Sequence, residues 1–241
     1  PDDPSIYAIP VMMHKQGLDQ QIVEKLTLKC SKPKLNDWKR VTKLESEQKG
    51  ETKIAMVGKY TELVDSYKSV NEALIHAGIH NKTNVKIEHI DSERFNKGVE
   101  NLEADGILIP GGFGNRGVKG MLNVAKFARE NNIPYCGICL GMQVAVREFA
   151  RNVLKLDADS TEFKKNTQHP VIGLITEWLD EDGLIQYRSE DSDKGGTMRL
   201  GGQVCHLKKN SKMAKLYKKL KIFERHRHRY EVNGNYESAF N

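Results

Sequence analysis

The chain has 241 residues, of which 38% are hydrophobic and 29% are charged, and its formal net charge is +6. These proportions are ordinary for a globular protein with one substantial core. No apolar run approaches the ~18 residues that would cross a membrane and no signal peptide is present, which argues against membrane and secreted proteins.

Cysteine usage bears on the compartment. Four cysteines in a chain of this length do not form a disulfide framework, so we expect a reducing compartment, the cytoplasm. The chain begins at Pro1 without a Met and stops after Asn241, so we expect it to be a piece of a larger protein.

The first fifty residues differ from the rest. Residues 5–10 are expected to be an extended segment broken by Pro10, and residues 17–26 a short helix. Residues 27–51 are polar and rich in lysine, with Trp38 as their one aromatic residue, so they are predicted to be a linker.

A regular alternation of strands and helices begins at residue 52. Strands are predicted at 53–58, 85–90, 104–110, 134–137, 170–175 and 203–207. Helices are predicted at 66–78, with Ser66 as a possible cap and Gly78 as a stop, at 118–131 and from Leu140 onward. This alternation predicts an α/β fold with a mostly parallel central sheet and helices on both faces.

The junction between residue 134 and Asn152 has the layout of a nucleophile elbow. A short apolar strand leads into Gly137-Ile-Cys-Leu-Gly141, which places Cys139 between two glycines at the start of an amphipathic helix. Amides and the dipole at a helix N-terminus favour a thiolate, so we expect the pKa of Cys139 to fall below about 8.5.

A second glycine-rich turn, Pro110-Gly-Gly-Phe-Gly114, follows another predicted strand at the same edge of the sheet. It does not match a phosphate-binding loop. An oxyanion hole fits better, with one amide from this turn and one from Leu140; a tight turn without chemistry is the alternative.

Cys136 and Cys139 also form a C-x-x-C pair, which raises a redox or metal site. Zinc would need a second pair of ligands, and Cys30 and Cys205 are isolated in the sequence. Because Cys136 falls inside a predicted central strand, we interpret it as a buried core residue.

Basic residues are concentrated between 207 and 230. A nucleic-acid surface is one interpretation. We favour the solvated face of a helix, because Met213, Leu216, Tyr217 and Leu220 keep a helical spacing and no aromatic platform accompanies the charge.

The two glycine turns together resemble the class I (triad) glutamine amidotransferases, which have a flavodoxin-like α/β fold. Further motifs resemble the CTP synthase family across nearly the whole chain: Gly58-Lys-Tyr60, Ser160-Thr-Glu-Phe163, Gly195-Gly-Thr-Met-Arg-Leu-Gly201 and Glu224-Arg-His-Arg-His-Arg-Tyr-Glu-Val-Asn233. Residues 1–26 resemble the end of that family's amidoligase domain, so the resemblance implies an amidotransferase domain over residues 52–241.

The resemblance assigns roles to individual residues. It implies that Cys139 attacks glutamine to form a γ-glutamyl thioester and releases ammonia, with the amides of Gly112 and Leu140 as the oxyanion hole. The substrate would be held by residues matching the family's glutamine site: Phe113, Gln143, Glu162 and Arg229. From the residues alone, Glu162 could cap a helix, Arg229 could be a surface arginine and Gln143 could face solvent.

The resemblance also implies partners and cofactors. The ammonia would pass to the amidoligase domain, which converts UTP to CTP with ATP and Mg²⁺, while GTP activates the glutaminase step; Arg188 and residues 195–201 resemble a region tied to that activation. The full enzyme would be a homo-oligomer, a tetramer. No cofactor, metal, membrane or nucleic acid is expected for this domain itself.

One family motif does not occur in the sequence. Triad amidotransferases carry a His-Pro-x-Glu motif that supplies the general base and the acid orienting it, whereas His169-Pro170 is followed by Val-Ile. We therefore expect these residues alone to bind glutamine weakly and to turn it over poorly. A non-catalytic assembly or regulatory fragment of the same enzyme is the alternative function.

Overall fold

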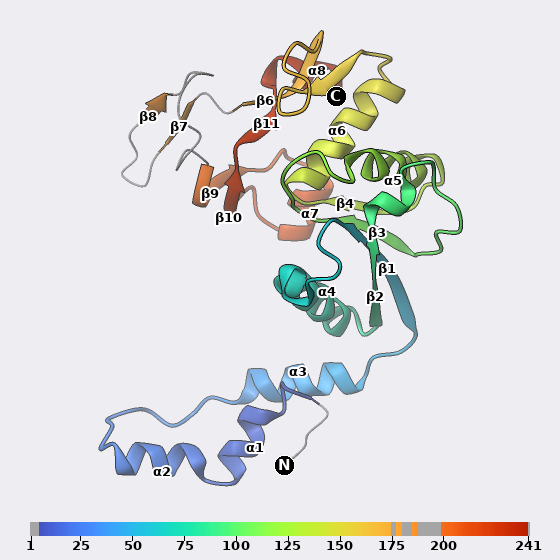
Figure 1. Ribbon diagram of the computed structural model, residues 1–241. Coiled ribbons are helices and arrows are strands. Elements are labelled where there is room, and N and C mark those ends of the chain that lie inside the picture. The colour runs from blue at the N-terminus through green and yellow to red at the C-terminus, as the bar shows by residue number, and fades with distance from the viewer. Residues whose placement is uncertain (1–4, 175–176, 180–184, 188–198, 241) are drawn as a thin grey trace.

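The computed structural model describes residues 5–174, 177–179, 185–187 and 199–240 (Figure 1). Its main sheet has four parallel strands in the order β2-β1-β3-β4. These strands are β1 (Glu51–Gly58), β2 (Asn84–Asp91), β3 (Gly106–Ile109) and β4 (Tyr135–Gly137).

Helices cover both faces of this sheet, because its central strands are apolar on both sides. On β1, Ala55 and Val57 join the core formed with α5 (Val118–Glu130) and α6 (Leu140–Asn152). Met56, which points the other way, packs in a separate cluster with Val70 and Leu74 of α4 (Lys68–Asn81). The predicted α/β class with a parallel sheet between helices is therefore confirmed.

The later strands form smaller sheets instead of extending the central one. β5 (Ala158–Ser160), β6 (His169–Leu174) and β11 (Tyr230–Val232) make a sheet in the order β11-β6-β5, which packs on the end of α6. β9 (Arg199–His206) pairs antiparallel with β10 (Lys221–His228), and β7 (Glu177–Leu179) with β8 (Ile185–Tyr187). The remaining short elements are η1 (Val64–Tyr67), η2 (Ser92–Phe95), α7 (Lys212–Tyr217), η3 (Gly234–Tyr236) and α8 (Glu237–Phe240).

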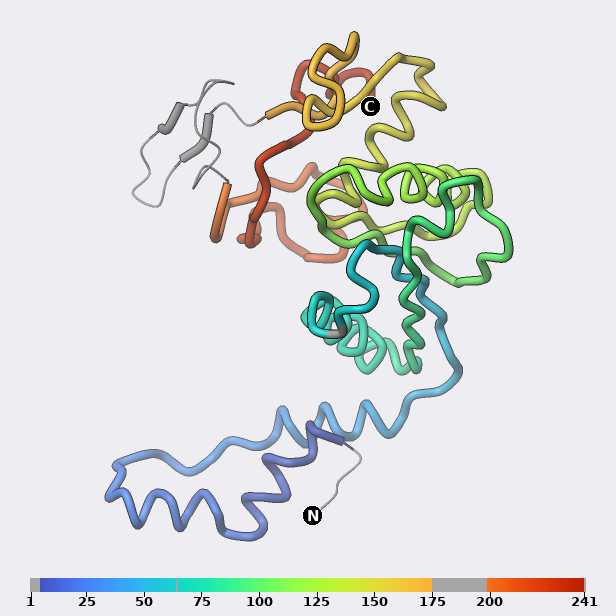
Figure 2. Tube along the Cα trace, in the orientation of Figure 1, coloured from blue at the N-terminus to red at the C-terminus, as the bar shows by residue number. Residues whose placement is uncertain are grey.

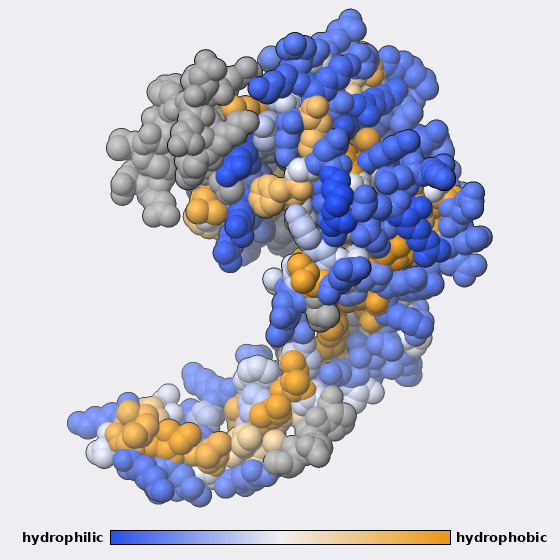
Figure 3. All heavy atoms as spheres, in the orientation of Figure 1, coloured by the Kyte–Doolittle hydropathy of each residue, from blue (hydrophilic) through white to orange (hydrophobic). Residues whose placement is uncertain are grey.

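An arm of three helices precedes the sheet: α1 (Ile9–Lys15), α2 (Leu18–Lys25) and α3 (Asn36–Ser46). Figure 2 shows the arm extending away from the body, and Figure 3 shows hydrophobic side chains along it. The expected extended segment at 5–10 is wrong, because α1 begins at Ile9 and tolerates Pro10 in its first turn. The predicted linker, residues 27–51, contains α3; its boundaries as a domain junction stay a prediction.

Two further local predictions are corrected. α4 begins after Tyr67, so Ser66 is not its cap. It runs through the buried Gly78 to Asn81 and is capped by Lys82, whose backbone is left-handed. In the basic region, α7 is only six residues long. Arg225 and Arg227 lie on the strand β10, and Arg229 directly follows it, so the predicted solvated helix holds only for the first part of the basic region.

The sheet order fixes where a site can form. The chain moves outward from β1 to β2 and then returns to place β3 on the other side of β1. Neighbouring connections therefore diverge between the carboxyl ends of β1 and β3, which is where ligands bind in sheets of this kind. The segment after β1 and the glycine turn after β3 both lie at that point.

Candidate active site

Cys139 occupies a sharp turn between β4 and α6. Its φ of 54° and ψ of −107° are rare for a residue with a side chain. An added Cβ on Gly137 would overlap the backbone of Gly141, and one on Gly141 would overlap the carbonyl oxygen of Ile109. Both glycines are thus required for the close approach of backbone, and the predicted elbow layout is confirmed.

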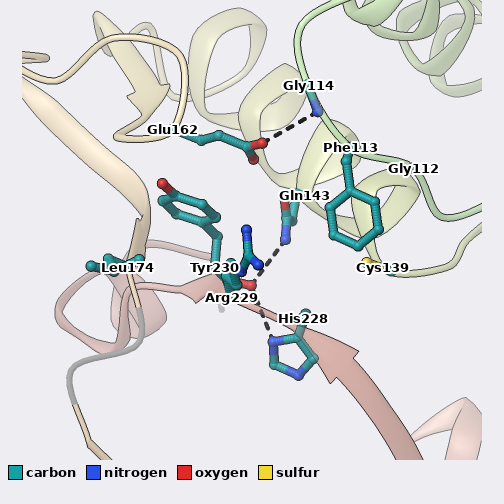
Figure 4. Close-up of a pocket in the computed structure, with 10 residues that line it drawn as sticks. All are labelled: Gly112, Phe113, Gly114, Cys139, Gln143, Glu162, Leu174, His228, Arg229 and Tyr230. Carbon is teal, nitrogen blue, oxygen red and sulfur yellow. Dashed lines mark hydrogen bonds between the residues drawn. The ribbon is translucent and has the colours of Figure 1, made fainter. Parts of the chain in front are cut away.

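A cavity of about 310 Å³ opens in front of this turn (Figure 4). Most of the residues predicted for a glutamine site line it, from segments far apart in the sequence. Those residues are Gly112, Phe113, Cys139, Gln143, Glu162 and Arg229. The structure adds residues for which the sequence predicted no role in the pocket: Gly114, Leu174, His228 and Tyr230.

The surroundings of the Cys139 thiol shift its pKa in opposite directions. Burial raises its pKa, the amides of Leu140 and Gly112 lower it, and the charge of Glu162 raises it. The net shift is upward, so the predicted fall in pKa is wrong: burial outweighs the amides. The thiol itself donates to the Arg227 carbonyl at 3.8 Å. The Leu140 and Gly112 amides lie near enough to the thiol to act on its pKa, and an oxyanion hole needs such backbone donors beside the nucleophile.

Gln143 and Arg229, both predicted to hold the substrate, lie in the pocket and not at the open surface, which was the alternative for each. Gln143 is 4% exposed and does not face solvent, since its Nε2 donates to the Tyr230 carbonyl at 2.9 Å. Arg229 lies in the pocket, and its buried Nε has no hydrogen-bond partner among the described residues. A guanidinium with an unused donor suits a carboxylate ligand.

Glu162 is placed by a turn that follows β5 and not by a helix cap. Its backbone N–H donates to Ser160 Oγ at 3.2 Å, just after β5. The neighbouring Asp159 pairs with Arg147 at 2.5 Å and Arg151 at 2.6 Å, which ties β5 to α6. Burial raises the pKa of Glu162, while the Gly114 amide and the charges of Lys59, Arg147 and Arg229 lower it.

His228 lies in the pocket with both ring nitrogens engaged. Nδ1 is 3.2 Å from the Tyr230 carbonyl, and Nε2 is 2.9 Å from Nδ1 of His226. A carbonyl only accepts, so Nδ1 carries the proton and Nε2 accepts from His226. Burial lowers the pKa of His228, as do His226 and Arg199. A neutral ring with its lone pair occupied is not placed to take a proton from Cys139.

Cys136 is not the buried core residue that was predicted. It is exposed, because β4 is the edge strand of the sheet and not a central one. Among the residues that the structure describes, no three His, Cys, Asp or Glu side chains are grouped to hold a metal ion.

The comparisons with known proteins agree with this geometry. Residues 62–240 match the sequence profile of the glutamine amidotransferase class-I family. The chain belongs to the class-I glutamine amidotransferases. It is similar to a solved structure, the glutaminase domain of Trypanosoma brucei CTPS with bound acivicin. The two share 42% sequence identity with a TM-score of 0.65, over 78% of this chain and 71% of that one.

The candidate site contains a residue to which the sequence assigned no role, His228. His228 belongs to the alternating His226-Arg-His228 run, whose spacing on a strand sends both imidazoles to one face.

Arg188 and residues 195–198, resembling the region tied to GTP activation, lie outside the described residues. In the part of the chain that is described, no helix is long and apolar enough to cross a membrane.

Proposed function

We propose that the pocket hydrolyses L-glutamine with Cys139 as nucleophile, and that the chain is the glutaminase part of a CTP synthase. The observation that carries this proposal is the position of Cys139 on a strained strand-to-helix turn, where it lines a cavity together with Gly112, Gln143, Glu162 and Arg229. The similarity to a glutaminase domain that binds acivicin supports glutamine as the substrate.

Substrate binding uses the charges on the wall opposite Cys139 (Figure 4). Arg229 pairs with the α-carboxylate of glutamine, and Glu162 with Gln143 holds the α-ammonium group. Phe113 lies beside the side chain of the substrate. This orientation delivers the carboxamide carbon to the sulfur.

The chemistry then runs in two stages. The Cys139 thiolate forms a bond to the carboxamide carbon, and the carbonyl electron pair moves to the oxygen, which accepts from the amides of Gly112 and Leu140. The carbonyl re-forms as the C–N bond breaks, the nitrogen takes a proton and ammonia departs, so that Cys139 carries a γ-glutamyl thioester. In the second stage water hydrolyses this thioester, which releases glutamate and restores the thiol. In triad amidotransferases the general base is the His of a His-Pro-x-Glu motif, which does not occur in residues 1–241.

The ammonia serves the amidoligase domain of the same polypeptide, which aminates UTP to CTP with ATP and Mg²⁺ under activation by GTP. The full enzyme is a cytoplasmic tetramer. These statements rest on the similarity to CTPS and on the motifs shared with that family.

The full enzyme offers a direct test, because ammonia can replace glutamine as the nitrogen source. Cys139→Ala is expected to abolish CTP formation from glutamine and to preserve CTP formation from ammonia. Arg229→Met is expected to raise KM for glutamine roughly 10- to 100-fold, the effect of losing a charge-assisted hydrogen bond.

Arg225→Met is the matched control, since Arg225 is exposed on β10, the strand that leads into Arg229, and does not line the pocket. The proposal fails if Cys139→Ala retains glutamine-dependent synthesis, or if the two arginine variants have the same KM.

A further inference from the structure

Lys59 is a buried cation that the proposed chemistry does not use. It follows β1 directly, at the point where β1 and β3 connections diverge, and it is 3% exposed. Its Nζ donates to the carbonyl oxygen of Phe113 at 3.0 Å and to that of Gly114. An ammonium group buried at this depth therefore has its donors directed at the glycine turn.

The other side of the turn is held by Glu162. Its Oε1 accepts the Gly114 N–H at 3.4 Å (Figure 4). The Phe113 carbonyl and the Gly114 N–H belong to one peptide group, which is planar and moves as a unit. Lys59 and Glu162 thus grip the two ends of a single peptide, a pair of contacts that we call the peptide clamp.

The turn needs such a restraint because of its composition. Gly111 and Gly112 have no Cβ to limit their backbone angles, and Gly114 has a φ of +73°. The Lys59 stem also packs under the turn: its Cδ is 3.4 Å from the position that a Cβ on Gly112 would occupy. Outside the turn, Arg116 donates to the Lys59 carbonyl and pairs with Glu93 at 3.0 Å, so the anchor itself is fixed.

We propose that the peptide clamp orients the Gly112 amide toward the reacting oxygen, which makes Lys59 a positioning residue for the oxyanion. This inference rests on the proposed glutaminase function. Lys59 does not touch the substrate or the sulfur, and it acts through the backbone of the turn.

The charge state of Lys59 is compatible with this role. Burial lowers its pKa to about 8, with Arg116 also lowering it and Glu162 raising it. At pH 7 the group is therefore still mainly an ammonium, which makes stronger hydrogen bonds to carbonyl oxygens than a neutral amine.

Two probes of Cys139 separate positioning of the oxyanion from general integrity of the site. L-Glutamate γ-semialdehyde adds the thiol across its aldehyde: an S–C bond forms, the C=O π bond breaks and the oxygen takes the charge or a proton. Iodoacetamide alkylates the same sulfur with loss of iodide and creates no oxyanion. The binding constant for the aldehyde and the alkylation rate are measured at pH 7.

Lys59→Met is expected to weaken aldehyde binding roughly 10- to 100-fold and to change the alkylation rate by less than about threefold, since one oxyanion donor is misplaced while the thiol is intact. Lys59→Arg, which keeps a cation, should recover most of the binding. Lys126→Met, a change of an exposed lysine on α5, should match the wild type.

Wild-type aldehyde affinity in Lys59→Met would overturn the inference, and so would an equal loss in both probes, which would make Lys59 a support of the whole site. If Lys59→Met does not fold, Lys59→Gln carries the same comparison. A wild-type protein that binds no aldehyde would instead contradict the proposed function.

Discussion

At the scale of single residues, the site balances a strained backbone against a buried thiol. Cys139 keeps a positive φ that costs of order 1–3 kcal/mol, and only the glycines around it permit that turn. Burial raises the pKa of the thiol more than the Leu140 and Gly112 amides lower it. The proposed attack therefore needs a base that removes the thiol proton.

The charge of Glu162 should be visible in the titration of Cys139. Its carboxylate disfavours a second negative charge, so Glu162→Gln is expected to lower the pKa of the Cys139 thiol. Because the thiolate is the reactive form, the pH profile of iodoacetamide alkylation should shift to lower pH in this variant.

In the wild type, the pH at which the alkylation rate is half-maximal should lie above about 8.5, the ordinary pKa of a thiol. Asp157→Asn, a change of an exposed carboxylate paired with Lys164, is the control and should leave the profile in place. A shift to higher pH in Glu162→Gln would contradict the account of the thiol.

At the scale of elements, the strand-turn-helix unit of β4 and α6 holds the site together. Gly141 lies in the first turn of α6 against the end of β3, so the helix approaches the sheet as closely as backbone atoms allow. That contact places the N-terminus of α6 beside the glycine turn that follows β3. The amides of Gly112 and Leu140, proposed as the oxyanion hole, therefore depend on the same packing.

Gly141→Ala should break this unit. Its Cβ would overlap the Ile109 carbonyl, and relief of that overlap requires the helix to move, so the free energy of unfolding is expected to fall by about 3 kcal/mol in urea titrations. Gly173→Ala provides the control: nothing lies within 4 Å of its added Cβ, and the expected change is within about 1 kcal/mol. Similar stabilities for the two variants would contradict the packing argument.

At the scale of the whole molecule, the pocket gathers residues from the ends of β3 and β4, from the segment after β5 and from the β10–β11 junction. The parallel sheet and both glycine turns could be predicted from the sequence, because strand-helix alternation and glycine requirements are local properties. The exposure of Cys136 could not be predicted, since it depends on which strand lies at the edge of the sheet. The raised pKa of Cys139 likewise depends on burial by distant segments.

The contacts of Lys59 likewise depend on segments that are distant in the sequence. Gly58-Lys-Tyr60 was recognisable as part of a family motif, but its grip on Phe113 and Gly114 arises only when β1 and β3 lie side by side. The sequence also assigned no role to the histidine pair on β10. His228 lines the pocket only because β11, which follows it, pairs with β6.

Cys139 is the proposed nucleophile of a glutamine site. Acivicin, which the similar CTPS domain binds, tests this role through peptide mapping by mass spectrometry after incubation with the protein. We predict one adduct, on Cys139, that forms more slowly when L-glutamine is present and persists in Cys136→Ser. An adduct on Cys136, or labelling of Cys139 that L-glutamine does not slow, would contradict the account.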